Sequence, residues 1–493
     1  MKNYKALVIL FIISVISTSC FQDIDDEQVS NNAINDFIWK GMNRFYLYKD
    51  DVPNLANNRF LDNQEFNAFL NTFSKPEDFF ENLIHQRATV DRFSWIVDDF
   101  IALEQSFDGI VTSNGMEFQI FRFNNSGNNR YGIVTHVLPN TSADANGVKR
   151  GDIFYAINNT QLTVNNTSAL LRADNYTINL GNYNDNNTLD TTDDFVTATQ
   201  TSINLSKEQY TEDPILVNKV LNVNGTKIAY LMYNSFTGTE QFNTDLNTVF
   251  GNFKSENATE LVLDLRYNSG GSVTTAIILS SLITGQFNDD IFSTEEWNDE
   301  FQEAFENEDP ELLINRFVNS NNGASLNSLN LNRLYVLTTR RSASASELVI
   351  NSLRPYINVV QIGATTAGKF QASTTLYDSE NFRRQGANPS HSYAMQPLIF
   401  KSLNVNGVTD YFNGLTPDIG LNERINNLGV LGDINEPLLA EAITNITGTG
   451  KSSNQKGDTV TPMQNAKYVS TKNEGMYVDK KLPVQLIKRI LFE

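Results

Sequence analysis

The sequence predicts a multidomain protein of mixed α/β and β architecture. A helical region is followed by a β-rich region and then by an α/β core of strand–turn–helix units. Three observations predict this. At 493 residues the chain is too long for one ordinary hydrophobic core. Apolar residues make up 40% of the chain and charged residues 19%, which argues against global disorder. The spacing of the apolar residues also changes twice, from helical periodicity to alternation and then to buried strands that lead into helices.

The first nineteen residues are predicted to be a targeting signal. Lys2 and Lys5 precede an apolar run over residues 6–16, which is shorter than the ~20 residues of a membrane span and suits a signal peptide. Small residues then lead to Cys20, the only cysteine. This pattern resembles a bacterial lipobox, although Ser17 stands where a large aliphatic residue is usual. The resemblance implies a lipidated mature N-terminus at Cys20; a plain secretory signal with an incidental cysteine is the alternative.

Residues 20–33 are predicted to be an acidic tether. We therefore expect a lipoprotein of the cell envelope, held at the outer membrane by its lipid and facing either the periplasm or the cell exterior. The formal net charge of −20 repels phosphate backbones, so no nucleic-acid partner is expected. A lone cysteine excludes an intramolecular disulfide. We expect no metal and no other cofactor, and the oligomeric state stays open.

Residues 34–105 are predicted to form a small helical domain. Apolar residues over 34–45 fall near one helical face. Asp62 or Asn63 is expected to cap a second helix, and Pro76 to lie in the first turn of a third. No residue of this domain is predicted to take part in chemistry.

Residues 106–206 change to short alternating strands and turns. Within them, residues 139–153 predict a short helix, a glycine turn and a Gly-Asp pair that leads into a strand over 153–157. Here the sequence resembles a PDZ domain, permuted as in bacterial proteases. The resemblance implies that a substrate C-terminus binds as an added strand; a PDZ-like fold with a degenerate groove is the alternative. The loop expected to hold the terminal carboxylate consists of Gly115, Met116, Glu117 and Phe118.

Residues 207–445 contain the two segments in which we expect the residues of a functional site. In the first, a buried strand that begins at Glu260 enters a turn with Gly270 and Gly271, and the helix that follows ends at Gly285. Paired glycines before a helix N-terminus leave backbone N–H groups free to face an anion. A phosphate-binding loop is the alternative, but the Walker spacing and its Lys-Ser/Thr pair are absent.

The second segment is a strand over 334–339, a serine-rich turn over 342–347 that opens a helix, and a further strand over 357–362 that leads to Gly368 and Lys369. A strand, a serine turn and a helix in this order expose a hydroxyl at a helix N-terminus.

Together the two segments resemble the tail-specific, or C-terminal processing, serine peptidases. The family's Asp-Leu-Arg-x-Asn-x-Gly-Gly stretch is matched by residues 264–271, and its Ser-Ala-Ser-Ala-Ser-Glu stretch letter for letter by residues 342–347. Its catalytic lysine follows a glycine 25 positions after the nucleophilic serine, and Lys369 stands at that spacing from Ser344. The resemblance covers residues 34 to about 445. It implies an endopeptidase that uses a Ser–Lys dyad near the free C-termini of proteins or peptides.

The chemistry of a serine nucleophile is consistent with this pairing. A serine hydroxyl needs a base, and of the three histidines only His391 falls in the core, on a loop where a structural role is expected. A buried lysine can serve, because desolvation lowers its pKa from about 10.4 by about 3–5. The N–H of Ala345, with that of Gly270 or Gly271, is expected to bind the oxyanion.

Three questions stay open in the sequence. Many relatives carry a glutamine four positions after the lysine; here Ser373 stands there and Gln371 lies two positions after it, so either, or neither, orients the amine. Residues 286–332 are expected to be a surface helix pair, with a lid or a cleft wall as the alternative, and residues 446–493 a polar linker with an apolar tail. A catalytically inactive peptide-binding lipoprotein on the same fold is the alternative function.

Overall fold

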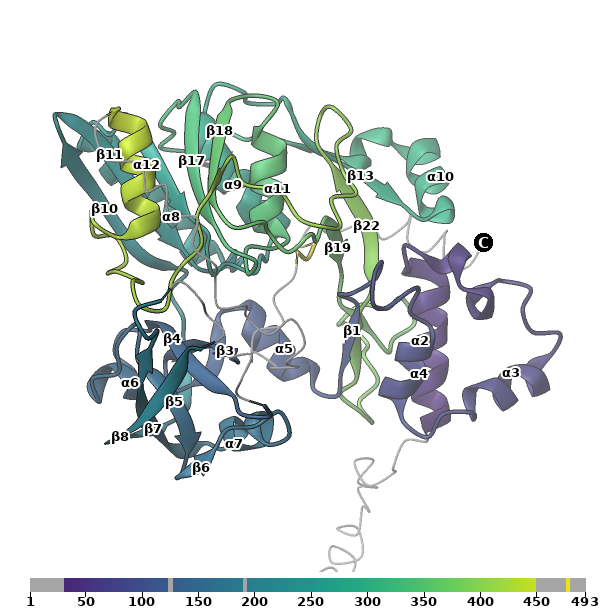
Figure 1. Ribbon diagram of the computed structural model, residues 1–493. Helices are drawn as coiled ribbons and strands as arrows, with labels where there is room; N and C mark the ends of the chain where they lie inside the picture. The colour runs from purple at the N-terminus through teal and green to yellow at the C-terminus, as the bar shows by residue number, and fades with distance from the viewer. Residues whose placement is uncertain (1–30, 123–126, 189–192, 449–475, 479–493) are drawn as a thin grey trace, which may run out of the picture.

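The computed structural model describes residues 31–122, 127–188, 193–448 and 476–478 (Figure 1). The predicted signal segment, Cys20 and the apolar end of the tail lie outside the described residues. Within the described ranges, no helix is both long enough and apolar enough to cross a bilayer. The same ranges hold no cluster of three or more His, Cys, Asp or Glu side chains placed to bind a metal ion.

The N-terminal region is helical, as predicted, and begins inside the predicted tether with α2 (Asn31–Phe45). The second helix, α3 (Asn63–Leu70), is capped by Asp62, whose side chain accepts a hydrogen bond from the Glu65 N–H. The third, α4 (Pro76–Asn82), starts at its proline. The region then joins the rest of the protein through β1 (Trp95–Val97), which pairs with β21 (Ala394–Gln396), and continues into α5 (Phe100–Phe107).

Residues 110–211, here called the middle unit, form a sheet in the order β3-β4-β5-β7-β8, with β3 (Met116–Phe121) at its edge. The predicted strand over 153–157 is confirmed as β5 (Ile153–Ile157), preceded by the short helix α6 (Ser142–Ala145). A ladder of β2 and β9 joins the two ends of the unit. The other elements are β2 (Ile110–Ser113), β4 (Tyr131–Val137), β6 (Thr160–Gln161), α7 (Thr167–Arg172), β7 (Asn175–Asn184), β8 (Phe195–Ser206) and β9 (Glu208–Thr211).

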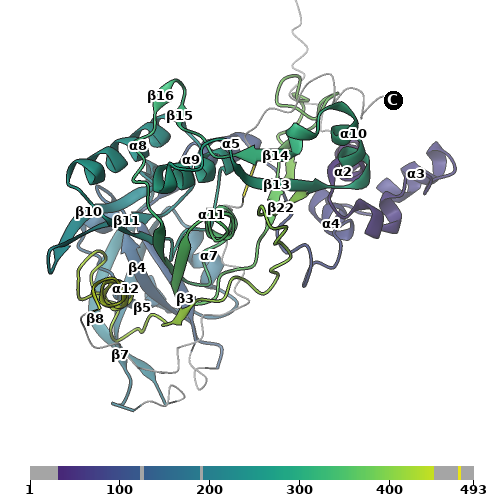
Figure 2. The same cartoon turned by 90° about the horizontal axis from the view of Figure 1, so that it is seen from above.

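The core is a six-stranded sheet in the order β10-β11-β12-β17-β18-β23. Only the β10–β11 pair is antiparallel; the other neighbours run parallel. Alternate residues of its buried strands face two separate apolar clusters, so α8, α9 and α11 cover one face and α12 covers the other (Figure 2). The strands are β10 (Ile215–Val223), β11 (Thr226–Tyr233), β12 (Glu260–Asp264), β17 (Arg333–Thr338), β18 (Asn358–Gly363) and β23 (Ile419–Gly420); the helices are α8 (Glu240–Ser255), α9 (Val273–Thr284), α11 (Ala345–Leu353) and α12 (Pro437–Thr447).

The insertion between the two motif segments, residues 286–332, is not the expected surface helix pair. Only α10 (Asp299–Glu308) is an α-helix, while β13 (Ile291–Trp297) joins a four-stranded sheet in the order β14-β13-β22-β19. The partner strand β22 (Leu398–Leu403) lies far along the chain, so local spacing could not reveal it. The sheet also contains β14 (Ile314–Arg316) and β19 (Gln371–Ser373), and the aromatic side chains of the insertion are buried in the core: Phe292, Trp297, Phe301 and Phe305.

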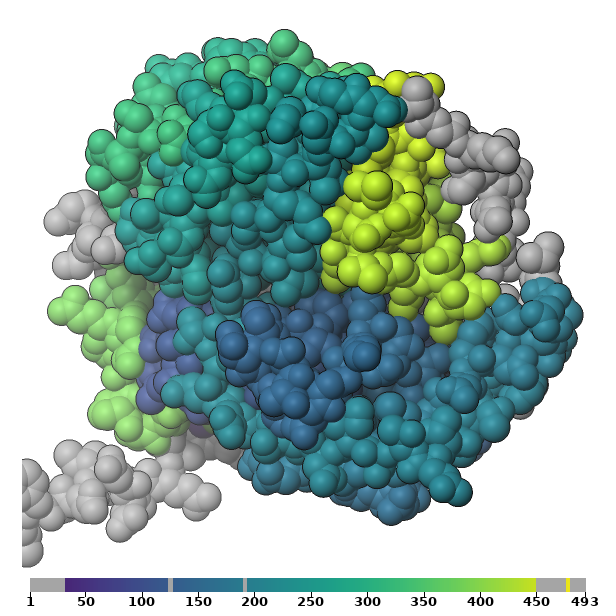
Figure 3. Space-filling model, turned by 90° about the vertical axis from the view of Figure 1, so that its left-hand side faces the viewer, coloured from purple at the N-terminus to yellow at the C-terminus, as the bar shows by residue number. Residues whose placement is uncertain are grey.

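The middle unit and the core lie directly against each other. Figure 3 shows the middle unit beneath the core, with the segment that includes α12 beside both. Arg150 of the middle unit crosses this boundary, donating to the Tyr267 hydroxyl at 2.6 Å and to the Glu423 carboxylate at 2.6 Å. Both partners belong to the core, and Tyr267 lies in the loop that follows β12.

Candidate active site

The candidate site lies where three neighbouring parallel strands end. The loops that follow β12, β17 and β18 carry the glycine pair, the serine turn and Lys369 respectively. Because the carboxyl ends of adjacent parallel strands meet at one edge of a sheet, segments about a hundred residues apart come together there. Ser342 Oγ donates to the Leu265 carbonyl at 2.7 Å, which ties the serine turn to the loop after β12.

Ser344 occupies the N-cap position of α11 with φ 65° and ψ −115°. A positive φ is costly for a residue with a Cβ and must be enforced by its surroundings. The Ser344 N–H donates to Glu347 Oε2 at 2.9 Å, and the Ser344 carbonyl accepts from the Leu348 N–H at 2.8 Å. Gly270 packs against the same turn: a Cβ on it would lie 2.6 Å from the Ser344 Cβ, so only glycine fits there.

Glu347 has a role in the site that the sequence did not predict. It is buried in the first turn of α11, and besides Ser344 its carboxylate accepts hydrogen bonds from the N–H of Gly368 at 2.7 Å and of Lys369 at 2.8 Å. The Thr366 hydroxyl donates to it as well. One carboxylate therefore holds the backbone at both the serine and the lysine. Burial raises the Glu347 pKa, while these hydrogen bonds oppose the rise.

Lys369 is 4% exposed. Burial lowers the pKa of its ammonium group from 10.5 to about 8, while the carboxylates of Asp91 and Glu347 oppose the fall. Its Nζ lies 5.2 Å from the centroid of the Phe93 ring. Desolvation therefore acts on the pKa of this amine in the predicted direction, but Phe93 and Asp91 come from the N-terminal region, to which the sequence assigned no chemistry.

Arg92, between these two residues, is a second contribution of the N-terminal region. Its guanidinium donates to the carbonyls of Gly368 at 2.8 Å, Ala367 at 3.1 Å and Phe412 at 3.1 Å. Three carbonyls on one guanidinium fix the backbone immediately before Lys369. No local sequence signal marks this contact, because its partners lie some 300 positions along the chain.

The three serines of the turn have different partners. Ser342 Oγ accepts from the Thr339 N–H at 3.0 Å in addition to its bond with Leu265. Ser346 Oγ donates to the Asn268 carbonyl at 3.0 Å. Ser344 Oγ, by contrast, accepts a hydrogen bond from the backbone N–H of Met476. The middle serine is therefore the one whose hydroxyl faces a peptide segment rather than the scaffold of the loop.

The two glycines that were predicted as oxyanion donors differ in the structure. The Gly270 N–H donates to Asn268 Oδ1 at 2.8 Å and is already engaged. Gly271 lies beside it at φ 137°, where a Cβ would lie 2.4 Å from the Phe236 carbonyl oxygen. Gly270 is therefore the glycine that packs against Ser344 and Ala345, but its N–H is engaged, whereas the Gly271 N–H makes no hydrogen bond to the described residues.

Neither of the two predicted orienters, Gln371 and Ser373, is hydrogen-bonded to the Lys369 amine, and all three residues are described. Gln371 is buried, and its amide donates to the Tyr48 hydroxyl at 2.8 Å. Ser373 donates from its N–H and its hydroxyl to the Met476 carbonyl, at 2.9 and 3.3 Å. Among the described residues, no hydrogen bond joins Ser344 Oγ to Lys369 Nζ.

The histidines lie elsewhere. The His391 ring is 3.0 Å from Asp378 Oδ2, and the His136 ring is 3.2 Å from the Asn234 amide. His85 stacks on Tyr48 with 5.8 Å between the ring centroids. All three histidines are described, and none of their rings is hydrogen-bonded to Ser344.

The loop predicted to bind a terminal carboxylate has its first donors occupied. The Gly115 N–H donates to Ser113 Oγ at 3.0 Å, and the Met116 N–H donates to Asn114 Oδ1 at 3.1 Å. The rest of the predicted loop, Glu117 and Phe118, lies within β3, and Arg341 of the serine loop donates to the Phe118 carbonyl at 3.5 Å.

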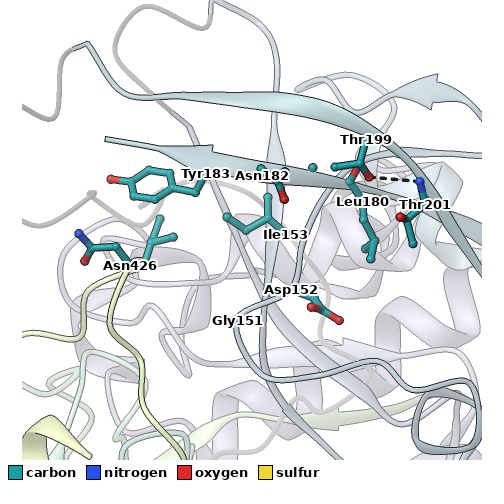
Figure 4. Close-up of a pocket in the computed structure, with 11 residues that line it drawn as sticks. Gly151, Asp152, Ile153, Leu180, Asn182, Tyr183, Thr199, Thr201 and Asn426 are labelled. Atoms are coloured by element: carbon teal, nitrogen blue, oxygen red, sulfur yellow. Dashed lines mark hydrogen bonds between the residues drawn. The ribbon is translucent and has the colours of Figure 1, made fainter. Parts of the chain in front are cut away.

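A cavity of about 410 Å³ lies away from these residues, between the sheet of the middle unit and a loop of the core. Figure 4 shows Tyr183 and Asn426 at one end of it and Asp152 below. It is lined by the Gly-Asp turn, by β7 and β8, and by Ile425 and Asn426 of the core. It contains none of the residues of the candidate site.

The fold and the serine-bearing loop define the class: a multidomain α/β protein of the serine peptidase kind. A scan of family profiles matches Peptidase family S41 over residues 227–420 and the Peptidase S41 N-terminal domain over residues 33–95, together more than half of the chain. The chain belongs to peptidase family S41, and the predicted family and fold class are confirmed.

Solved structures with the same fold include a protein from Bacteroides fragilis described as an S41 protease. It shares 24% sequence identity and a TM-score of 0.64, over 84% of this chain and 98% of that one. The photosystem II D1 C-terminal processing protease shares 16% identity and a TM-score of 0.49, over 84% of this chain and 99% of its own. A comparison with curated proteins found no match.

Proposed function

We propose that the chain is a serine endopeptidase in which Ser344 is the nucleophile and Lys369 the general base. The observation that carries the proposal is the Glu347 carboxylate, which holds the backbone of both residues while burial lowers the pKa of Lys369 to about 8. An amine with this pKa is neutral in roughly a tenth of the molecules at pH 7 and in most of them at pH 9. Neutral lysine can accept the serine proton.

The chemistry then follows from the groups at the loop edge. Ser344 Oγ attacks the peptide carbonyl carbon as its proton passes to Lys369 Nζ, and the carbonyl oxygen becomes an oxyanion. The N–H groups of Gly271 and Ala345 are the donors that this proposal assigns to it. Lys369 then gives this proton to the departing amine, which leaves Ser344 as an acyl ester. The same lysine takes a proton from a water molecule, and this water hydrolyses the ester. The Met476 N–H, which donates to Ser344 Oγ, would have to leave before a substrate carbonyl could reach this oxygen.

We further propose that substrates are cut near their C-termini because the middle unit binds the end of the peptide along β3. This strand is at the edge of its sheet, so its backbone can pair with an added strand. Arg341 connects that edge to the serine turn. Since the Gly115 and Met116 N–H groups already have partners, pairing with β3 is expected to supply more of the affinity than a terminal carboxylate. Amidating a bound peptide should therefore weaken binding less than tenfold in calorimetry.

The test of the catalytic assignment is a set of four proteins compared with a fluorophosphonate probe and a peptide substrate. Ser344→Ala should lose labelling and cleavage. Lys369→Arg should lose nearly all cleavage, because a guanidinium stays protonated at usable pH. His391→Ala should remain largely active, and wild-type kcat/KM should rise with pH as the Lys369 ammonium deprotonates. An active Lys369→Arg protein, or a folded but inactive His391→Ala protein, would replace the lysine with a histidine-based site.

A further inference from the structure

Three residues from near the end of the chain cross the candidate site as an extended strand. All four backbone groups of Met476 and Tyr477 are hydrogen-bonded to the core. On one side, the Met476 carbonyl accepts from the Ser373 N–H at 2.9 Å, and the Val478 N–H donates to the Ser373 carbonyl at 3.0 Å. On the other side, the Tyr477 N–H donates to the Gly271 carbonyl at 3.1 Å. The Tyr477 carbonyl accepts from the Val273 N–H at 3.2 Å. The segment therefore fills a slot with a backbone edge on each side.

The side chains of Met476 and Tyr477 also pack against the core and against α5. Met476 is fully buried and belongs to the main hydrophobic cluster. The Tyr477 ring packs against Phe107 of α5, with 4.4 Å between the ring centroids. The Tyr477 hydroxyl accepts from the Gly238 N–H at 3.2 Å. These contacts come from three different parts of the fold, which indicates a shaped binding site rather than a chance contact.

The position of the segment relative to the nucleophile decides its consequence. The Met476 N–H donates to Ser344 Oγ, so the hydroxyl that the proposed mechanism requires is covered by a peptide group. The Gly271 residue that we assign to the oxyanion hole also accepts from the segment through its carbonyl. A substrate strand could not enter this slot while residues 476–478 occupy it.

We propose that residues 476–478 are an intramolecular ligand of the peptide slot and keep the site closed until the segment is displaced. This inference rests on the proposed function for its catalytic consequence, whereas the binding of the segment stands on the hydrogen bonds alone. The occupant is the chain itself, and the slot recognises an extended peptide with a buried apolar residue at the nucleophile and an aromatic residue after it.

The length of chain before the segment is compatible with such a ligand. Twenty-seven residues, 449–475, separate Met476 from the end of the described core, and they are rich in Gly, Ser, Thr, Asn and Lys. Linkers of this composition and length give a tethered ligand an effective concentration near the millimolar range. A segment with only weak intrinsic affinity would therefore occupy the slot for most of the time, yet a substrate or a partner could still displace it.

The test uses the full-length protein and two matched proline variants. Tyr477→Pro removes the N–H that donates to Gly271 and the ring that packs on Phe107. Tyr468→Pro makes the same chemical change at another Tyr-Val pair of the tail and is the control. Hydrogen exchange is measured over residues 271–273 and 371–373. The N–H groups of Val273 and Ser373 should exchange roughly tenfold faster or more in Tyr477→Pro than in wild type or Tyr468→Pro. Equal exchange in all three proteins would overturn the inference whatever the catalytic activity.

The catalytic consequence is measured on the same proteins. Tyr477→Pro should react with a fluorophosphonate probe roughly tenfold faster or more than wild type. A synthetic peptide of residues 473–480 should slow that reaction competitively, and a scrambled peptide should not. Faster exchange with equal labelling would overturn the closure but not the peptidase function. Faster exchange with no labelling of any protein would overturn the peptidase function instead. A wild-type chain found by mass spectrometry to be cut between residues 475 and 476 would show a substrate rather than an inhibitor.

Discussion

The buried amine of Lys369 has a consequence for stability as well as for catalysis. Its pKa is 10.5 in the unfolded chain and about 8 in the folded protein. Between these values the unfolded chain binds more protons than the folded one, so the free energy of unfolding gains from this group as pH rises from about 8 to 10.5. Below pH 8 the charged amine is buried at a net cost that corresponds to roughly 3 kcal/mol.

Lys369→Met should therefore be inactive but more stable than wild type at pH 7, by up to about 3 kcal/mol. The advantage should shrink when the comparison is repeated at pH 9.5. Urea unfolding at the two pH values measures it. Lys49→Met is a control of opposite sign, because Lys49 is buried with its amine 2.6 Å from the Glu300 carboxylate, and its loss should destabilise the protein. Equal destabilisation by both variants would show that Lys369 is a structural cation.

A second residue-scale prediction concerns Asp91, the carboxylate that opposes the fall of the Lys369 pKa most. Asp91→Asn keeps an oxygen for the N–H groups of Phe93 and Ser94, which donate to Oδ1 at 3.0 and 2.8 Å. It removes the negative charge. We expect the rise of kcat/KM with pH to move to lower pH, as the pKa of Lys369 falls further. Asp78→Asn, an exposed carboxylate on α4, should leave the profile unchanged; a shift to higher pH in Asp91→Asn would contradict the assignment.

At the scale of elements, Arg266 connects β12 to α12. Its side chain is fully buried, and its guanidinium donates to Asp264 at 2.8 Å and to Glu436 at 2.7 Å. Glu436 is also the N-cap of α12, where its side chain accepts from the Leu439 N–H. The arginine of the family motif therefore fastens the helix that covers the second face of the sheet.

Arg266→Met should lower the free energy of unfolding by about 3–5 kcal/mol, because it leaves two buried carboxylates without their cation. The matched control is Arg333→Met. Arg333 pairs with Glu260 at 2.6 Å but is 38% exposed, so its loss should cost no more than about 1 kcal/mol. Chemical denaturation of the two variants measures the difference. A similar small loss in both would mean that Arg266 is not an anchor of α12.

The elements also show how far sequence reasoning reaches. The strand over 153–157, the cap at Asp62 and the glycine end of α9 were predicted because each depends on neighbouring residues. The burial of the insertion's aromatic residues was missed because β13 finds its partner β22 about a hundred positions away.

In the site, Ser344 and Lys369 came from motif spacing. The contacts of Arg92 and Met476 came only from the structure, since nothing beside those residues in the sequence marks their partners. Glu347 stands between these cases: its place in the motif was visible, but its four hydrogen bonds depend on the loop that carries Lys369.

At the scale of the whole molecule, we propose that the protein is anchored to a membrane by a lipid on Cys20. The motif that supports this lies outside the described residues, and no described helix could cross a bilayer. Cys20→Ser should therefore move the protein from the membrane fraction to the soluble fraction, and Ser19→Ala should leave it in the membrane fraction. Fractionation followed by immunoblotting measures both. A Cys20→Ser protein that still sediments with membranes would require another anchor.

The contact of Arg92 with Phe412 spans 320 positions of the chain, and it helps to fix the loop of the proposed catalytic lysine. The pairing of β1 with β21 spans a similar length. During synthesis, the N-terminal region therefore cannot make these contacts until β21 and Phe412 have been synthesised, and only then can the loop of Lys369 be fixed. A ribosome-bound chain would lack the Arg92–Phe412 contact until about residue 412 has emerged, so the loop of the proposed base would stay unsupported for most of translation.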